Sequence, residues 1–117
     1  MTVTTDLTAV QALYEEIDKK FGRDIILMDL RELTPLADYF LIATGTSAPQ
    51  LAALADIAEE TLIKHGMKLR HREGIHSANW ILLDFGTIVV HLFDKEAREY
   101  YNLERIWGDA KTITPEV

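Results

Sequence analysis

The chain has 117 residues, a net charge of −7 at pH 7, 48% hydrophobic and 26% charged residues, and no cysteine. This length suffices for one compact core, and the composition is that of a globular protein rather than a disordered or repeat protein. The acidic balance opposes indiscriminate binding to nucleic acid phosphates, and the lack of cysteine excludes disulfides and thiolate metal sites. We therefore expect a single domain over residues 1–117 with an ordered core of about 6–107.

The first third of the chain predicts one helix and two strands. Apolar residues recur at spacings of three and four over residues 6–21, which predicts an amphipathic helix with Asp6 as its N-cap and Gly22 as its stop. Its apolar face would consist of Leu7, Val10, Leu13, Ile17 and Phe21. The short apolar runs Asp24–Leu30 and Tyr39–Ala43 predict two buried strands.

A second helix is predicted after Gly45-Thr46-Ser47. Ser47 and Gln50 fit a capping box, Pro49 is tolerated in the first turn, and Gly66 supplies the stop. The expected buried face consists of Leu51, Leu54, Ala55, Ala58 and Leu62. Strand, helix and the next strand would then form a crossover unit.

The last part of the chain predicts three strands and a helix. Residues 67–72 alternate between apolar and basic, which favours a strand near a sheet edge. Trp80–Phe85 and Ile88–Phe93 predict a hairpin, residues 94–107 a helix, and residues 108–117 a loose tail. The expected fold class is α/β, a single domain with a mixed five-stranded sheet and flanking helices.

Two blocks of the sequence resemble the ribosomal silencing factor (RsfS, Iojap-like) family. The first is E-G-x-x-x-x-x-W-x-L-L-D-F-G-x-x-V-V-H-x-F-x-x-x-x-R-x-Y-Y-x-L-E-R-x-W, from Glu73 to Trp107. The second, within residues 24–47, contains D-I-I-L-M-D-L and A-D-Y-F-L-I-A-T-G-T-S. The resemblance implies a nucleotidyltransferase-like fold without that family's metal carboxylates. It also implies a non-enzymatic translation repressor that binds the large ribosomal subunit through its fourteenth protein and blocks docking of the small subunit when nutrients are scarce.

A partner-binding patch is expected from residues that match the family block and are not all required by a core, namely Trp80, Asp84, His91, Tyr100, Tyr101 and Glu104. For Trp80 the core and interface interpretations both stand. For His91 the alternative is a ring nitrogen hydrogen-bonded within the sheet. Helical spacing favours burial of Tyr100, and the acidic side chains would face basic groups of the partner.

A nucleotide-binding protein related to the nucleotidyltransferases is the alternative function. Gly45-Thr46-Ser47 resembles the Gly-Ser start of those enzymes, but two-metal chemistry requires paired carboxylates, whereas Asp29, Asp38 and Asp84 are isolated. We therefore favour a capping role for Ser47. The histidines lack metal-ligand spacing and no serine or threonine has a visible base, so no cofactor, metal or catalytic residue is predicted.

The remaining expectations concern further partners and location. Lys64, Lys68, Arg70 and Arg72 form a basic cluster that is either a charged strand face or a peripheral contact with ribosomal RNA phosphates. An edge strand and exposed aromatic residues could also pair two copies into a homodimer when the protein is free. No apolar run approaches the roughly 20 residues that span a bilayer, and the first residues show no targeting pattern, so we expect no membrane contact and a cytoplasmic location.

Overall fold

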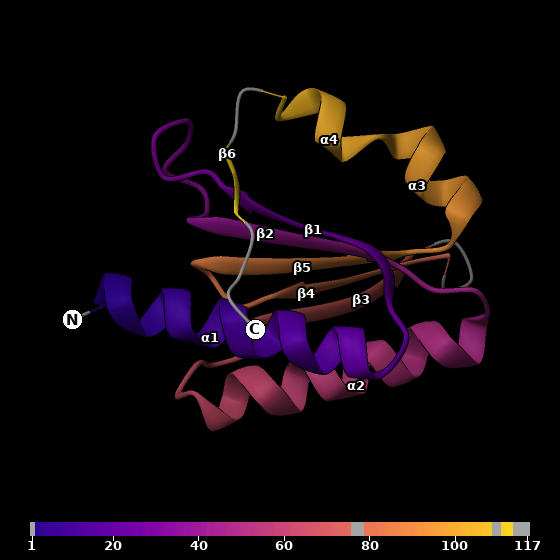
Figure 1. The fold of residues 1–117 in the computed structure, drawn as a ribbon, viewed down its shortest axis with the longest axis horizontal. Coiled ribbons are helices and arrows are strands. Elements are labelled where there is room, and N and C mark those ends of the chain that lie inside the picture. The colour runs from indigo at the N-terminus through magenta and orange to yellow at the C-terminus, as the bar shows by residue number, and fades with distance from the viewer. Residues whose placement is uncertain (1, 76–78, 109–110, 114–117) are drawn as a thin grey trace.

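The computed structural model of the chain describes residues 2–75, 79–108 and 111–113. The elements are α1 (Thr2–Lys19), β1 (Arg23–Asp29), β2 (Tyr39–Thr44), α2 (Ala48–Lys64), β3 (His71–Ile75), β4 (Trp80–Asp84), β5 (Ile88–Phe93), α3 (Lys95–Tyr101), α4 (Leu103–Ile106) and β6 (Lys111–Ile113). Within these residues the strands form one six-stranded sheet in the order β3-β4-β5-β2-β1-β6. The helices α1 and α2 cover one face of the sheet, and α3 and α4 lie on the other (Figure 1). No helix in the described ranges is long and apolar enough to cross a membrane.

The centre of the sheet is the parallel pair β2 and β5, in which Leu41 lies opposite Val90. Successive side chains of a strand point to opposite faces, so each of these strands supplies two cores. Leu41 and Val90 belong to the core under α1 and α2, whereas Ile42 and Phe93 belong to the core under α3 and α4. Burial on both faces explains why these segments are continuous apolar runs.

The connection from β2 to α2 is fixed by hydrogen bonds of Ser47 and Gln50. Ser47 Oγ accepts from the backbone N–H of Gln50 at 3.2 Å, which confirms the predicted N-cap. The side chain of Gln50 reaches further than a capping box requires. Its Oε1 accepts from Thr46 N at 2.6 Å, and its Nε2 donates to the carbonyl oxygens of Phe21 at 3.0 Å and Lys20 at 3.3 Å. Gln50 therefore ties the turn after α1 to the turn before α2.

The expected buried face of α2 is confirmed, but the crossover differs from the prediction. The five predicted residues of α2 are each at most 1% exposed. The strand parallel to β2 is β5, not the next strand in the sequence. The two strands between them in the sequence, β3 and β4, form an antiparallel pair on the far side of β5, with β3 at the edge of the sheet. The predicted hairpin is present as β4 and β5, with Gly86 at φ +87° in the turn.

The first helix differs from the prediction at both ends. It begins at Thr2, so the expected N-cap at Asp6 is wrong, and it ends at Lys19. Val10, Leu13 and Ile17 are fully buried as predicted. Phe21 lies beyond the helix at φ +66° and is 79% exposed, so it leaves the predicted apolar face.

The predicted strand over residues 67–72 is displaced toward the C-terminus. Met67 and Leu69 pack half-buried against the core, which accounts for the alternation in the sequence. Their segment is not a strand, however, and the contact with β4 starts where Arg70 N donates to Asp84 O at 2.8 Å. As expected, β3 lies at an edge of the sheet.

The predicted helix over residues 94–107 is two helices. Asp94 caps α3 by accepting from Ala97 N at 2.8 Å, and Asn102 at φ +47° breaks the helix before α4. A left-handed residue changes the direction of the chain, so the helical spacing assumed for Tyr100 does not hold across it. Tyr101, rather than Tyr100, packs against the core.

The expected loose tail also differs from the structure at residues 111–113. These residues form β6, in which Thr112 lies opposite Met28 of β1 in an antiparallel pair. The outer edge of β1 offers unpaired N–H and C=O groups, and a backbone of any polar sequence can satisfy them. A polar composition therefore did not reveal this strand.

We expect Gln50→Leu to lower the free energy of unfolding by about 2 kcal/mol, because a typical intramolecular hydrogen bond contributes about 1 kcal/mol net and Gln50 makes several. Urea denaturation would measure the change. Gln11→Leu on α1 is the matched control, since that glutamine carries none of these contacts. Equal stability of both variants would show that the tether between the two turns is unimportant.

Candidate partner-binding surface

A concave surface lined by aromatic residues lies between the start of β4 and one flank of α3. It encloses about 370 Å³ and is lined by Asn79, Trp80, Glu96, Ala97, Tyr100 and Tyr101. We call this surface the aromatic cup. The hairpin places Trp80 opposite Phe93 at the end of β5, and α3 begins directly after that strand. This topology brings the tryptophan of β4 beside the tyrosines of α3.

The indole of Trp80 is held in place by His91 and two further rings. Trp80 Nε1 donates to His91 Nδ1 at 3.3 Å, and the indole centroid lies 5.1 Å from the ring of Phe93 and 4.7 Å from that of Tyr101. The indole remains half-buried. One part of the ring therefore belongs to the core and another lines the cup, and the interface interpretation of Trp80 stays a prediction.

His91 lies beneath the cup and is 5% exposed. Burial lowers its pKa from 6.5 to about 4, because a charged imidazole would lose its hydration there. Since the indole N–H can only donate, Nδ1 accepts and the neutral ring carries its proton on Nε2. Among the described residues Nε2 has no hydrogen-bond partner. The alternative interpretation of His91 holds, because its ring nitrogen is bonded within the sheet.

The tyrosines of α3 form the outer wall of the cup. Tyr100 is 80% exposed, and its ring meets that of Tyr101 at a centroid distance of 5.0 Å and an interplanar angle of 89°. Glu96 is exposed and lies one helical turn before Tyr100 on the same flank. The cup therefore offers aromatic ring faces beside a carboxylate, which suits a cationic side chain.

Asp84 and Glu104 are not part of the cup. Asp84 stands at the other end of β4, about 13 Å along the strand from Trp80 at the usual rise per residue. There its Oδ1 accepts from Gly86 N at 2.8 Å in the hairpin turn. Glu104 belongs to α4 and pairs with Arg98 of α3 at 3.0 Å. Three of the six predicted residues thus line the cup, His91 contacts one of them from beneath, and the two acids have structural partners.

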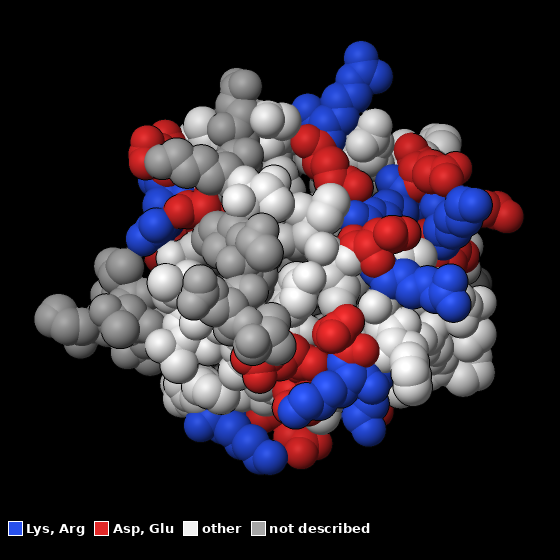
Figure 2. Space-filling view, in the orientation of Figure 1, with Lys and Arg blue, Asp and Glu red and all other residues white. Residues whose placement is uncertain are grey.

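The predicted basic cluster is partly neutralised by acids of α2. Arg72 lies 2.9 Å from both Asp56 and Glu59, and Lys64 lies 3.6 Å from Glu60. Of the four residues of the cluster only Arg72 lies on a strand, because Lys64 ends α2 and Lys68 and Arg70 precede β3, so the predicted charged strand face is reduced to Arg72. On the side of the molecule shown in Figure 2, acidic and basic side chains are interspersed rather than gathered into a patch of one sign.

The segment Gly45-Thr46-Ser47 uses its hydrogen-bonding groups within the chain. Gly45 N donates to Phe93 O at 2.9 Å, Thr46 N to Gln50 Oε1, and Ser47 Oγ accepts from Gln50 N. A phosphate bound at a helix start requires free N–H groups, so this local arrangement favours the capping role of Ser47. In the described part of the chain no three histidine or acidic residues lie close enough together to hold a metal ion.

Glu96 and Asn79 are cup residues that sequence reasoning missed. Glu96 could have been found from its spacing of four residues before Tyr100, which places both side chains on one flank of a helix. Asn79 carried no such signal, because its place depends on the turn that leads into β4.

Comparison with known proteins identifies the family. The profile described as "Ribosomal silencing factor during starvation" matches residues 4–117. The chain belongs to this family. It is 42% identical over 93 residues to the ribosomal silencing factor RsfS of Bacillus subtilis, covering 80% of this chain and 79% of that protein. With RsfS of Halalkalibacterium halodurans it shares 36% identity over 104 residues, which is 89% of each chain. A crystal structure of a Chromobacterium violaceum protein has the same fold, with a TM-score of 0.82 at 32% identity over 95% of this chain and 92% of that one.

The buried His91 predicts a pH dependence of stability. In the unfolded chain its pKa returns to about 6.5, so below that pH the unfolded state binds a proton that the folded state does not. This contribution to stability is complete above pH 6.5 and is lost as the pH falls to about 4. We expect it to lower the free energy of unfolding by about 2 kcal/mol between pH 7 and pH 5.

Urea denaturation of the parent and of His91→Gln at both pH values would measure this contribution. His91→Gln should reduce the change in the free energy of unfolding between pH 7 and pH 5, whatever effect it has on stability at pH 7. The control His71→Gln, on the exposed edge strand, should keep the slope of the parent. An unchanged slope in His91→Gln would contradict the assignment of a buried neutral imidazole.

Proposed function

We propose that the protein is a translation repressor that binds the large ribosomal subunit and blocks joining of the small subunit when nutrients are scarce. Membership of the ribosomal silencing factor family supports this function. In this proposal the partner on the subunit is its fourteenth protein, and the protein acts in the cytoplasm. A nucleotidyltransferase-like scaffold would serve for binding rather than for group transfer, so no catalytic residue or cofactor is required.

The aromatic cup is the observation that supports a specific contact surface. Aromatic residues carry much of the binding energy in protein interfaces, and the cup holds its rings rigidly through Trp80, Tyr101 and the buried His91. Glu96 adds an acidic group at the cup of a chain whose net charge is −7. A basic side chain of a ribosomal protein fits this chemistry, because a cation is attracted both to ring faces and to a carboxylate.

Three further contacts belong to the proposal with smaller roles. Asp84 and Glu104 lie outside the cup, so they would flank the interface rather than form its centre. Lys68 and Arg70 are the members of the basic cluster without an ion pair to α2, and they would approach ribosomal RNA phosphates. The exposed edge of β3 would pair two copies when the protein is free, and a mass measurement in solution tests that pairing.

Co-sedimentation with isolated ribosomal subunits tests the function. We expect the protein to sediment with large subunits and, in excess, to reduce the fraction of joined ribosomes, because it would occupy the face on which the small subunit docks. Binding to small subunits alone, or unchanged joining at saturating binding, would refute silencing by this route.

Tyr100→Ala tests the cup as the contact surface. Tyr100 is 80% exposed, so its replacement should change the free energy of unfolding by no more than about 0.5 kcal/mol. Affinity for the large subunit should fall by about 2 kcal/mol if the ring is a hot spot, which is roughly thirtyfold in Kd. Phe21→Ala is the matched control, since Phe21 is 79% exposed and lies outside the cup. Equal losses in both variants would contradict the assignment.

Glu96→Gln and Glu96→Lys test the charge of the partner. We expect weaker binding in the order parent, glutamine, lysine, and a smaller effect of salt on association in the glutamine variant, because the removed attraction is electrostatic. Glu60→Gln and Glu60→Lys on α2 provide the control at another exposed position. Stronger binding by Glu96→Lys would mean that the cup faces an acidic partner.

A further inference from the structure

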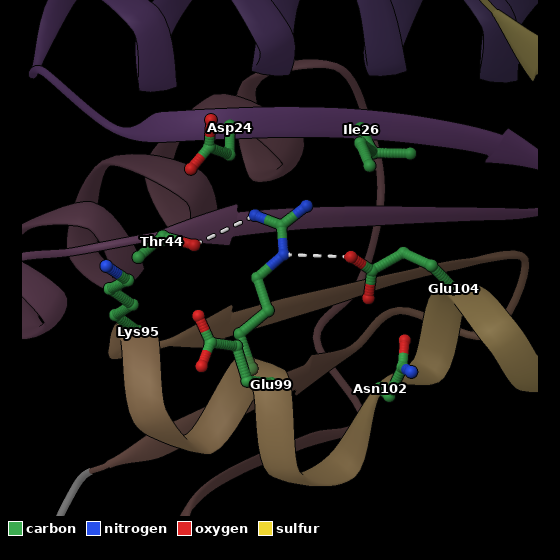
Figure 3. A pocket seen from close by; sticks show the side chains of 8 residues that line it. Asp24, Ile26, Thr44, Lys95, Glu99, Asn102 and Glu104 are labelled. Atoms are coloured by element: carbon green, nitrogen blue, oxygen red, sulfur yellow. Dashed lines mark hydrogen bonds and ion pairs between the residues drawn. The ribbon is translucent and has the colours of Figure 1, made fainter.

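A second concave site lies on the flank of α3 opposite the aromatic cup. This cleft encloses about 560 Å³ between α3, α4 and the facing ends of β1 and β2 (Figure 3). Its charged lining comes from Asp24 of β1, Lys95, Arg98 and Glu99 of α3, and Glu104 of α4. The hydroxyl of Thr44 on β2 lies beside them. An adjoining cleft of about 490 Å³ shares Asp24, Thr44 and Lys95. The two together form a groove at the carboxyl end of the parallel strand β2, the position where ligands bind in open α/β sheets.

The floor of the cleft holds an arginine that is only 8% exposed. Arg98 Nη1 donates to Thr44 Oγ1 at 2.8 Å, and its Nε donates to Glu104 Oε2 at 3.0 Å. A guanidinium carries five N–H donors, so these two bonds leave three N–H groups to satisfy. Figure 3 marks these two bonds as dashed lines that end on Thr44 and Glu104. A buried cation with free donors of this kind suits a ligand carboxylate, which accepts two parallel hydrogen bonds.

The carboxylate that orients Arg98 is itself only partly satisfied. Glu104 Oε1 is buried and has no hydrogen-bond partner among the described residues. Buried polar atoms in proteins are almost always hydrogen-bonded, so an unpaired acceptor at the edge of a cleft is a second and independent sign of a missing donor. Among the described residues the site therefore lacks a donor for Glu104 Oε1, whereas no nitrogen of Arg98 is both buried and unpaired.

The charges around the cleft exclude a simple anion site. Beyond the Arg98–Glu104 pair, the lining offers two acids, Asp24 and Glu99, and one base, Lys95. A phosphate carrying two negative charges would be repelled by both acids. A ligand with separate positive and negative groups would satisfy all of them, because unlike charges could be placed beside each other.

The backbone of β1 is distorted where it lines the cleft. The register of β1 with β2 shifts between Arg23 and Ile26, and Asp24 has a left-handed φ of +49°. A non-glycine residue adopts this left-handed conformation at an energetic cost. Residues held in it are concentrated at ligand sites and tight turns. In Figure 3 this distorted segment holds the carboxylate of Asp24 on the side of the cleft facing Thr44 and Lys95.

We propose that this cleft binds a small zwitterion of the free amino acid type. Its carboxylate lies on Arg98 and Lys95, and its ammonium group faces the acids of the lining, which include the unpaired Oε1 of Glu104. The cleft of about 560 Å³ shares no lining residue with the aromatic cup, because α3 presents Tyr100 to the cup and Lys95, Arg98 and Glu99 to the cleft. Glu96 lines both the cup and the adjoining cleft. Loss of ribosome binding would leave this proposal intact, and absence of amino acid binding would leave the proposed repressor function intact.

Titration of the full chain with glycine, L-leucine and L-glutamine, followed by ¹H–¹⁵N NMR, tests the proposal. At least one of them should produce saturable shifts that include the Arg98 side-chain Nε–H. Acetate and ethylamine, each of which carries half of the zwitterion, should bind at least tenfold more weakly. No saturable shift up to about 10 mM, where a site of millimolar affinity is nearly filled, would overturn the proposal. Tighter binding of inorganic phosphate or of spermidine than of every amino acid would overturn it as well.

Variants at the exposed lining residues decide the geometry. Lys95→Gln and Glu99→Gln should each weaken amino acid binding about five- to tenfold, because each removes one charge pair, while Lys68→Gln outside the cleft should leave it unchanged. Arg98→Lys keeps the positive charge but removes the planar guanidinium that can bind a carboxylate through two hydrogen bonds, so it should abolish measurable amino acid binding. Should Arg98→Lys fail to fold, the two surface variants still decide, and unchanged affinity in both would refute the site.

Discussion

The parallel pairing of β2 with β5 is the constraint on which the rest of this structure depends. Both strands are buried on both faces, so the sheet must be covered on each side and a three-layer arrangement follows. One layer, α1 and α2, provides apolar bulk. The other layer is much smaller, because α3 and α4 are short, and it leaves part of the sheet face open beside them. Both candidate sites lie at the margins of this small layer.

The helix α3 is consequently the element that organises both sites. Its seven residues begin at the Asp94 cap and end at the left-handed Asn102. Ala97 and Tyr101 face the sheet, and the two flanks of α3 carry different side chains. One flank carries aromatic and acidic side chains, and the other carries both acidic and basic ones. Arg98 joins α3 to β2 through Thr44, so the position of the helix depends on a polar contact as well as on apolar packing.

The fold was largely predictable because its signals are local. Periodicity located α2, and apolar runs located β1, β2 and the hairpin, because burial of a strand on both faces requires consecutive apolar residues. The errors arise where a single backbone conformation or a contact between distant residues determines the environment of a side chain. Asn102 is an ordinary polar residue in the sequence, yet its left-handed conformation exchanged the environments of Tyr100 and Tyr101. The ion pair of Glu104 with Arg98 depends on that same break, so the sequence alone offered no means of assigning Glu104 to this pair.

The two edges of the sheet are unlike each other, and this difference limits how the protein can assemble. One edge is β3, whose residues from His71 to Gly74 are exposed. At the other, β6 covers Leu27–Asp29, and the remainder of β1 is irregular around Asp24. Strand pairing that propagates without limit requires two receptive edges, whereas pairing through one edge is complete with two copies. The edge strand on the β1 side is β6 itself, and because it has only three residues it offers few backbone groups to a further strand, so it disfavours growth of the sheet in that direction.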